Sequence, residues 1–212
     1  MFKRVCIVIP ALNEASTIAV MVKAVGKFGV TVVVDDGSSD RTAELALESG
    51  AVVVAHEKNL GYDAALNSGF IKAADLGVQI IITVDADGQH DPSQIQRFVD
   101  AIDAGADVVI GIRDRRQRCA EHLFAWYAGF RFRVQDPLCG MKAYRTTVYQ
   151  RLGHFDSYGS IGTELTFFAV KRGYRIDQIP LNVRQRIGES RFGQILSGNL
   201  KIIRAMIYSI CI

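Results

Sequence analysis

Five short runs rich in Val and Ile recur along the first half of the chain, separated by segments with the spacing of amphipathic helices. Such runs predict buried strands, and strands that alternate with helices predict βαβ units with a mostly parallel central sheet flanked by helices. The predicted strands are Val5–Ile9, Val30–Val34, Ala51–Ala55, Ile80–Val84 and Asp107–Ile112, and the predicted helices cover about 14–27, 40–48, 62–76 and 93–103. We therefore expect an α/β fold of the nucleotide-binding type.

The second half of the chain has a less regular pattern. The basic run Arg113–Arg118 is typical of an exposed, mobile surface segment. The helix predicted after it carries Leu123, Phe124, Trp126, Tyr127 and Phe130, a stripe whose spacing is typical of core packing. A turn at Asp136–Gly140, a helix near 162–172, a strand near 175–184 and an amphipathic helix at about 194–209 follow. The 212 residues predict a single domain that spans the whole chain, 1–212.

Bulk properties exclude several classes of protein. A hydrophobic content of 49% with 22% charged residues is that of a globular protein, and a net charge of +3 is too small to indicate a nucleic-acid partner. The four cysteines form no CxxC pair, so we expect reduced thiols. We find neither a secretory signal nor an apolar run of the roughly eighteen residues that a membrane span needs, and expect a cytoplasmic location.

Two carboxylates follow the apolar run Gln79–Val84 at the end of a predicted strand. Asp85 and Asp87 are one residue apart, and Gln89 comes two residues later. Open α/β sheets bind ligands at the carboxyl ends of their strands, and such oxygen ligands suit Mg²⁺ or Mn²⁺ that also binds substrate phosphates. The segment therefore predicts either a metal-diphosphate site or, because Asp and Gly favour turns, a simple turn.

Other polar residues end two further strands. These are Asn13 and Glu14 after the first strand, and Asp35 and Asp36 after the second. Acids that meet at one edge of a sheet repel each other unless a cation or ligand donors offset them, which favours the metal site. Ser39 or Asp40 is expected to cap the helix that follows. Pro10–Glu14 contains no Gly-rich phosphate loop, which argues against dinucleotide-binding, P-loop and nucleotidyltransferase proteins.

Four ordered segments resemble the family 2 glycosyltransferases of the GT-A fold. They are Val8–Glu14, Val34–Thr42, Asn59–Ala65 and Asp85–His90, and the resemblance covers nearly the whole chain. Within the family, Asp136–Gly140 and Gly188–Gly193 look most similar to the dolichol-phosphate mannose synthase branch, which makes polyprenyl-phosphate sugars.

The resemblance assigns roles to individual residues. It implies that Asp85, Asp87 and Gln89 coordinate the metal, that Arg113 lies near the phosphates, and that the donor nucleotide contacts Pro10, Asn13, Glu14, Asp36, Gly61 and Asp85. Asp87, Arg113 and Glu164 are then the expected catalytic residues. Glu164 has a second interpretation as an acid in the first turn of a helix, and His90 either touches the ligand or has a structural role.

A basic segment precedes the last helix. Arg184, Arg186, Ser190 and Arg191 surround Gly188, and we expect them to bind an acceptor phosphate. The family commonly has an arginine three residues before that glycine, where this chain has Gln185, so which arginine binds the phosphate is left open. The final helix is expected either to lie on the cytosolic face of a membrane or to pack as a core or lid helix.

The expected activity is inverting transfer of a hexose from a GDP-mannose or UDP-glucose type of donor to a dolichyl or undecaprenyl phosphate. A lipid phosphate is already ionised and needs no general base, whereas a saccharide hydroxyl, the alternative acceptor in cell-surface polysaccharide synthesis, needs a carboxylate. A homo-oligomer or a membrane-protein partner is compatible with the sequence. The intact Asp85 and Asp87 argue against the alternative of a non-catalytic nucleotide-sugar module.

Overall fold

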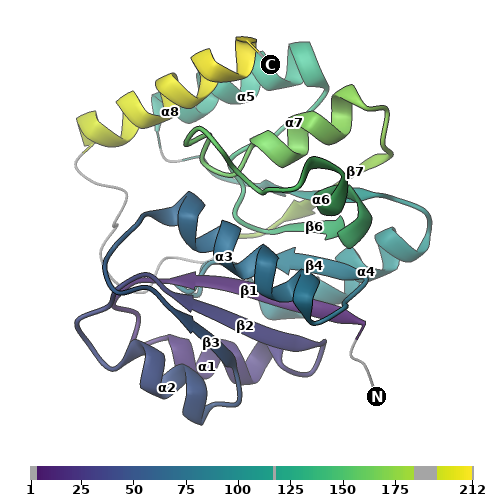
Figure 1. Ribbon diagram of the computed structural model, residues 1–212. Coiled ribbons are helices and arrows are strands. Elements are labelled where there is room, and N and C mark those ends of the chain that lie inside the picture. The colour runs from purple at the N-terminus through teal and green to yellow at the C-terminus, as the bar shows by residue number, and fades with distance from the viewer. Residues whose placement is uncertain (1–3, 117, 184–194, 212) are drawn as a thin grey trace.

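One seven-stranded sheet organises the chain, with the strand order β3-β2-β1-β4-β6-β5-β7 (Figure 1). The computed structural model describes residues 4–116, 118–183 and 195–211. The strands are β1 (Val5–Ala11), β2 (Val30–Asp35), β3 (Val52–Ala55), β4 (Ile80–Thr83), β5 (Val108–Arg113), β6 (Lys142–Arg145) and β7 (Ile176–Leu181). The helices are α1 (Ile18–Val25), α2 (Thr42–Glu48), α3 (Tyr62–Asp75), η1 (Pro92–Gln94), α4 (Ile95–Asp103), α5 (Cys119–Phe132), α6 (Thr146–Leu152), α7 (Glu164–Lys171) and α8 (Ile195–Cys211).

The mostly parallel sheet and all the predicted strands and helices are confirmed, with small shifts of their ends. β6 and α6 were not expected from the sequence. β6 is the exception to the parallel arrangement, because it pairs antiparallel with both β4 and β5. Its four residues, Lys-Ala-Tyr-Arg, begin two positions after the last residue of the predicted turn and contain no Val or Ile run, so no strand pattern marks them.

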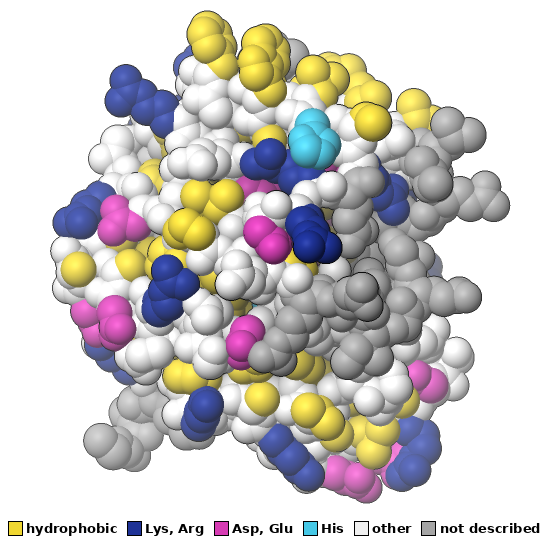
Figure 2. Space-filling view, turned by 180° about the vertical axis from the view of Figure 1, so that it is seen from behind, with side chains coloured by type: hydrophobic (Ala, Val, Ile, Leu, Met, Phe, Trp, Pro, Cys, Tyr) yellow, Lys and Arg dark blue, Asp and Glu magenta, His cyan; other side chains and the backbone are white. Residues whose placement is uncertain are grey.

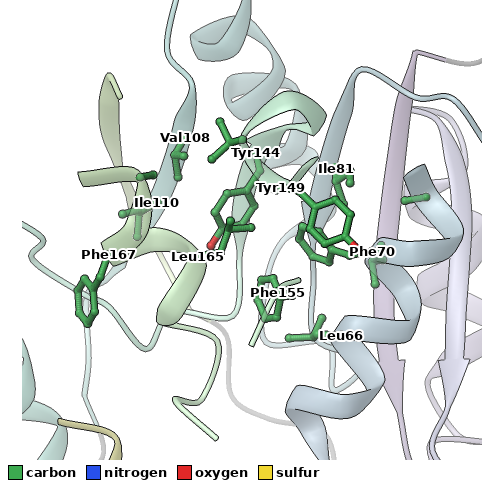
Figure 3. Packing of buried hydrophobic residues seen from close by; sticks show 14 of the residues in the cluster. Leu66, Phe70, Ile81, Val108, Ile110, Tyr144, Tyr149, Phe155, Leu165 and Phe167 are labelled. Carbon is green, nitrogen blue, oxygen red and sulfur yellow. The ribbon is translucent and has the colours of Figure 1, made fainter. Parts of the chain in front are cut away.

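Helices cover both faces of the sheet and create two hydrophobic cores. α1, α2 and α4 pack on one face, against alternate strand residues such as Ile7, Val33 and Ile82. α3, α5, α6, α7 and α8 pack on the opposite face, where Phe70 and Tyr144 lie in an aromatic cluster with Phe155 (Figure 3). Because strand side chains alternate between faces, this division follows from the period-2 pattern.

α5 packs against α8 at one end of the molecule (Figure 1). Phe124 is buried as expected, but the prediction that the whole aromatic stripe forms core is wrong for Trp126 and Phe130, which are 70% and 84% exposed. The helix α5 has two apolar faces. Phe124 and Ala128 are buried on the inner face, whereas Leu123, Trp126 and Phe130 are exposed on the outer face. Within the described ranges no helix is both long and apolar enough to span a membrane.

Candidate active site

A cavity of about 380 Å³ lies at the carboxyl ends of β1, β2 and β4. The parallel register aligns Ala11 with Asp35 and Val8 with Thr83, so the residues that follow these strands meet at one edge of the sheet. Eight of the residues singled out in the sequence line the cavity: Pro10, Glu14, Asp36, Gly61, Asp85, Asp87, Gln89 and Arg113. The structure therefore brings together most of the expected donor and metal residues.

Asp85 is held in the cavity wall by several neighbours. Its Oδ1 accepts a hydrogen bond from the Tyr62 hydroxyl at 3.3 Å, and its Oδ2 lies 3.7 Å from Nε2 of the buried His90. Burial raises the pKa of the Asp85 carboxyl, but the His90 ring and the Tyr62 hydroxyl outweigh it, so the net pKa lies below its ordinary value. Asp85 is therefore ionised at neutral pH.

Asp87 combines the two interpretations made from the sequence. Its Oδ1 accepts the backbone N–H of Gln89 at 3.0 Å, as in a turn, and the residue also lines the cavity beside Asp85. Among the described residues no group of three His, Cys, Asp or Glu side chains is arranged to hold a metal ion. Two carboxylates and the Gln89 amide still fit a hard divalent cation that takes its other ligands from a substrate.

Gly140, in the turn before β6, makes room for Asp85. A Cβ atom at this position would lie well inside van der Waals contact of the Asp85 carboxylate. Glycine is thus required at this position because the Asp85 carboxylate lies so close to the backbone, and not because the backbone conformation is unusual. This gives a physical reason for the glycine in the Asp136–Gly140 turn.

Arg113 ends β5 and is an ion-paired residue of the cavity wall. Its Nε lies 2.8 Å from Oδ2 of Asp136, its Nη2 lies 2.9 Å from Oδ1 of the same carboxylate, and Glu121 is 3.2 Å away. The expectation of an exposed, mobile segment is therefore wrong for Arg113, whose side chain is 17% exposed. Burial lowers the pKa of Arg113, but the Asp136 hydrogen bonds outweigh it, so the guanidinium stays charged.

Asp36 shapes the loop that precedes α3. Its carboxylate accepts the backbone N–H groups of Leu60 at 2.9 Å and Gly61 at 2.8 Å, and it contacts Nδ1 of His56 at 2.7 Å. Gly61 has a φ of 99°, a conformation that favours glycine. Both residues line the cavity, so they are placed to contact a nucleoside, which stays a prediction.

Asn13 is not among the residues that line the cavity. Its Oδ1 accepts the backbone N–H of Ser39 at 2.7 Å, which joins the loop after β1 to the loop after β2. Asp40 accepts the backbone N–H of Thr42 at 3.0 Å, but the N-cap residue of α2 is Arg41, so neither Ser39 nor Asp40 occupies the expected N-cap position. Asn13 therefore positions the loops here, and its contact with a donor stays a prediction.

Glu164 is the first residue of α7 and also lies outside the residues that line the cavity. Its carboxylate accepts from the Ser157 hydroxyl at 2.9 Å and contacts Nε2 of His154 at 2.8 Å. These contacts support the interpretation of an acid at a helix start, and a role in the reaction stays a prediction. Arg184, Arg186, Ser190 and Arg191 lie outside the described residues.

Lys142, the first residue of β6, was not expected from the sequence as a site residue. It lines the cavity and is only 3% exposed. β6 alternates, so that Met141 and Ala143 lie in one core and Tyr144 in the other. A lysine at an inward position of a buried strand is rare, but no strand pattern marks β6 in the sequence, so no local signal points to this lysine.

Ile161 and Gly162 also line the cavity, and we call the loop that contains them the roof loop. These two residues were not expected from the sequence. Ile161 has a φ of 56°, an unusual conformation for a β-branched residue. Asp63 holds it there by accepting the backbone N–H groups of Ile161 at 3.3 Å and Gly162 at 2.9 Å. Burial raises the pKa of Asp63 to about 6.

Comparison with known proteins identifies the family. The model of the family described as "Glycosyl transferase family 2" matches residues 6–162. The chain belongs to glycosyl transferase family 2. It is 30% identical to polyprenol monophosphomannose synthase of Mycolicibacterium smegmatis, with 87% of this chain and 78% of that protein covered. It is also 30% identical to dolichyl-phosphate hexose transferase of Haloferax volcanii, with 93% and 90% covered.

A solved structure shares the fold of this chain. Glucosyl-3-phosphoglycerate synthase from Mycobacterium tuberculosis, in complex with Mn²⁺, uridine diphosphate and glucosyl-3-phosphoglycerate, has a TM-score of 0.79 and 22% identity, over 99% of this chain and 81% of that one. The GT-A type of α/β fold, the family and the classification as a glycosyltransferase are thus confirmed.

Proposed function

We propose that this glycosyltransferase is a metal-dependent, inverting enzyme that moves a hexose from a GDP- or UDP-sugar to a polyprenyl phosphate. The observation that carries the proposal is that one cavity is lined both by the predicted metal ligands and by residues of an amphipathic helix. Asp85, Asp87 and Gln89 face it from the sheet edge, and Lys201 and Ile202 of the amphipathic α8 face it from the other side. The two relatives named for polyprenol and dolichyl phosphate transfer support the same acceptor class.

The chemistry follows from the charges around the cavity. Mg²⁺ or Mn²⁺ held by Asp85, Asp87 and Gln89 would neutralise charge on the diphosphate, as the complex of the M. tuberculosis synthase with Mn²⁺ and uridine diphosphate supports. Arg113, fixed by Asp136, supplies a second positive charge where the leaving group develops negative charge. Because the ion pair holds the guanidinium in place, little reorganisation is needed during the reaction.

The acceptor step needs no protein base when the acceptor is a phosphate monoester. One of its ionised oxygens attacks the anomeric carbon, and the bond to the nucleoside diphosphate breaks on the opposite side, which inverts the configuration. The position of Glu164 outside the cavity lining agrees with this route. Arg184, Arg186, Ser190 and Arg191 stay the proposed contacts of the acceptor phosphate.

The outer surface of α5 and α8 supports a lipid acceptor. On α5 the exposed apolar residues Leu123, Trp126 and Phe130 follow the spacing i, i+3, i+7, and the rings of Trp126 and Phe130 stack with centroids 6.4 Å apart. On α8 the same spacing places Leu200, Ile203 and Ile207 outward. Figure 2 shows hydrophobic side chains gathered at this end of the molecule. Such stripes favour helices that lie in a membrane interface.

The stripe and the cavity belong to the same two helices. Glu121 and Arg118 at the start of α5, and Lys201 of α8, line the cavity, while the outward residues of both helices form the apolar end. A lipid phosphate that enters the cavity would therefore keep its chain at the surface that lies against the membrane. We propose peripheral contact with the cytosolic face of the membrane through this surface.

Transfer to lipid is tested by partition of a labelled sugar. The full-length protein is incubated with Mn²⁺, polyprenyl phosphate and either GDP-mannose or UDP-glucose carrying a radioactive hexose. We expect label in the chloroform-methanol extract, and none with the Asp87→Ala variant. Donor turnover with all label in the aqueous phase would refute the lipid acceptor and favour a saccharide acceptor.

A further inference from the structure

Lys142 presents a buried positive charge to the cavity. Its ammonium donates to the backbone carbonyl of Gly162 at 2.7 Å, which joins β6 to the roof loop, and both residues line the cavity. β6 lies next to β4, with Lys142 opposite Thr83, two residues before Asp85. The lysine therefore lies on the strand beside the one that leads to the predicted metal ligands.

The protein does not pair this charge with a carboxylate of its own in the described part of the chain. Asp136 is engaged with Arg113, and Asp63 accepts from the backbone of the roof loop. An ammonium has three donors, and the carbonyl of Gly162 uses one of them. Burying a charge with so few partners is unfavourable, and burial lowers the pKa of Lys142 to about 8. At neutral pH the group still carries its proton.

A purely structural group at this position would not need a charge. A neutral amide can donate to one carbonyl without the desolvation of an ammonium, so the Gly162 contact alone does not explain a lysine. The charged groups around Lys142 are Asp63 from α3, Asp136 before β6 and Arg113 from β5. Burial raises the pKa of the nearby Cys139 thiol to about 12, so that group is neutral. Arg113 repels the ammonium and is itself paired with Asp136 and Glu121. A phosphate oxygen in the cavity is the kind of ligand that would accept from the remaining donors of Lys142.

We propose that Lys142 is a phosphate-binding residue of the cavity, whose ammonium contacts an ionised phosphate oxygen of a substrate. This assignment rests on the proposed function, because that function brings two phosphate groups into the cavity: the diphosphate of the donor and the monophosphate of the acceptor. Both sources offer the same chemistry, a charge-assisted hydrogen bond to an N⁺–H donor.

The test compares three substitutions that separate charge from hydrogen bonding. Lys142→Met removes both, Lys142→Gln keeps a donor for Gly162 but no charge, and Lys142→Arg keeps the charge. Lys23→Met, at an exposed position of α1, is the matched control. Binding of inorganic pyrophosphate and of inorganic phosphate to the full chain is measured by calorimetry with Mn²⁺ present, after thermal melting has shown that each variant is folded.

We expect Lys142→Met and Lys142→Gln to weaken binding of one anion about ten- to hundredfold, with Lys142→Arg recovering most of the affinity and the control unchanged. Weaker pyrophosphate binding assigns the contact to the donor, and weaker phosphate binding assigns it to the acceptor. Wild-type affinity for both anions in Lys142→Gln would overturn the proposal, because charge would then be unnecessary. If Lys142→Met does not fold, Lys142→Gln alone decides.

These measurements need no transfer activity, so they are independent of the identity of the acceptor. A wild-type protein that fails to label lipid, but whose Lys142→Gln variant binds pyrophosphate more weakly, would refute the lipid acceptor and keep the role of Lys142. In an active protein, the KM values for donor and for polyprenyl phosphate give a second readout. If Lys142 contacts a phosphate in the ground state, its substitution should raise only one of the two KM values and leave kcat unchanged.

Discussion

The cavity has two walls of opposite charge. The acidic wall consists of Glu14, Asp36, Asp85 and Asp87 and follows the ends of parallel strands. The basic wall carries Arg113, Arg118, Lys142 and Lys201, together with the Glu121 carboxylate that pairs with Arg113, and comes from β5, the antiparallel β6, and the helices α5 and α8. A metal ion suits the first wall and phosphate oxygens suit the second. A nucleoside diphosphate bound between the walls would be neutralised by the metal ion on one side and by the cationic side chains on the other.

The largest expected effect on turnover comes from removing the Asp87 carboxylate from the acidic wall. We expect Asp87→Ala to lower Mn²⁺-dependent turnover by about three powers of ten, because a lost metal ligand removes several kcal/mol of charge stabilisation. The lost hydrogen bond to Gln89 should cost about 1 kcal/mol of folding free energy, so the variant stays folded. Turnover is measured as release of nucleoside diphosphate.

Asp91→Ala is a matched control for this experiment. Asp91 lies in the same segment and accepts the backbone N–H of Ser93 at 2.9 Å, so the substitution also removes a capping carboxylate. It leaves the cavity lining intact. Full activity of the Asp87→Ala variant would exclude the proposed metal site.

The two walls meet at Gly140, which gives a second and smaller effect. Gly140→Ala places a methyl group against the Asp85 carboxylate, so the carboxylate must move. We expect Mn²⁺ affinity in the presence of a nucleoside diphosphate to fall about tenfold or more, as for other residues that orient metal ligands. Gly129→Ala in α5 is the control, because a Cβ there lies no closer than 3.9 Å to its nearest neighbour. Unchanged Mn²⁺ affinity would show that Asp85 does not depend on this contact.

Sequence alone predicted the acidic wall far better than the basic wall. Asp85 and Asp87 follow a continuous apolar strand, and parallel strands end at one edge, so their convergence could be expected. Lys142 follows no such pattern: β6 is four residues long, and its position between β4 and β5 depends on pairing between distant segments. The ion pair of Arg113 with Asp136 joins residues 23 positions apart and likewise could not be expected from local sequence.

The smallest expected effect concerns the apolar surface outside both walls. Trp126 and Phe130 on α5 are exposed, so replacing both with alanine removes no core packing. If they enter a membrane interface, the double variant should bind vesicles of anionic lipid about tenfold more weakly, or by about 1.4 kcal/mol, since each ring then buries part of its apolar surface. Vesicle binding is measured by sedimentation.

A control for this surface is available at the opposite end of the molecule (Figure 1). Val20 on α1 and Leu47 on α2 are 70% and 64% exposed, and their double alanine variant should bind vesicles like the wild type. Turnover with detergent-solubilised acceptor should be unchanged in both double variants, because neither pair lines the cavity. Equal vesicle binding by the Trp126 and Phe130 variant, with a change in its oligomeric state, would instead assign the apolar end of α5 to contact between copies of this chain.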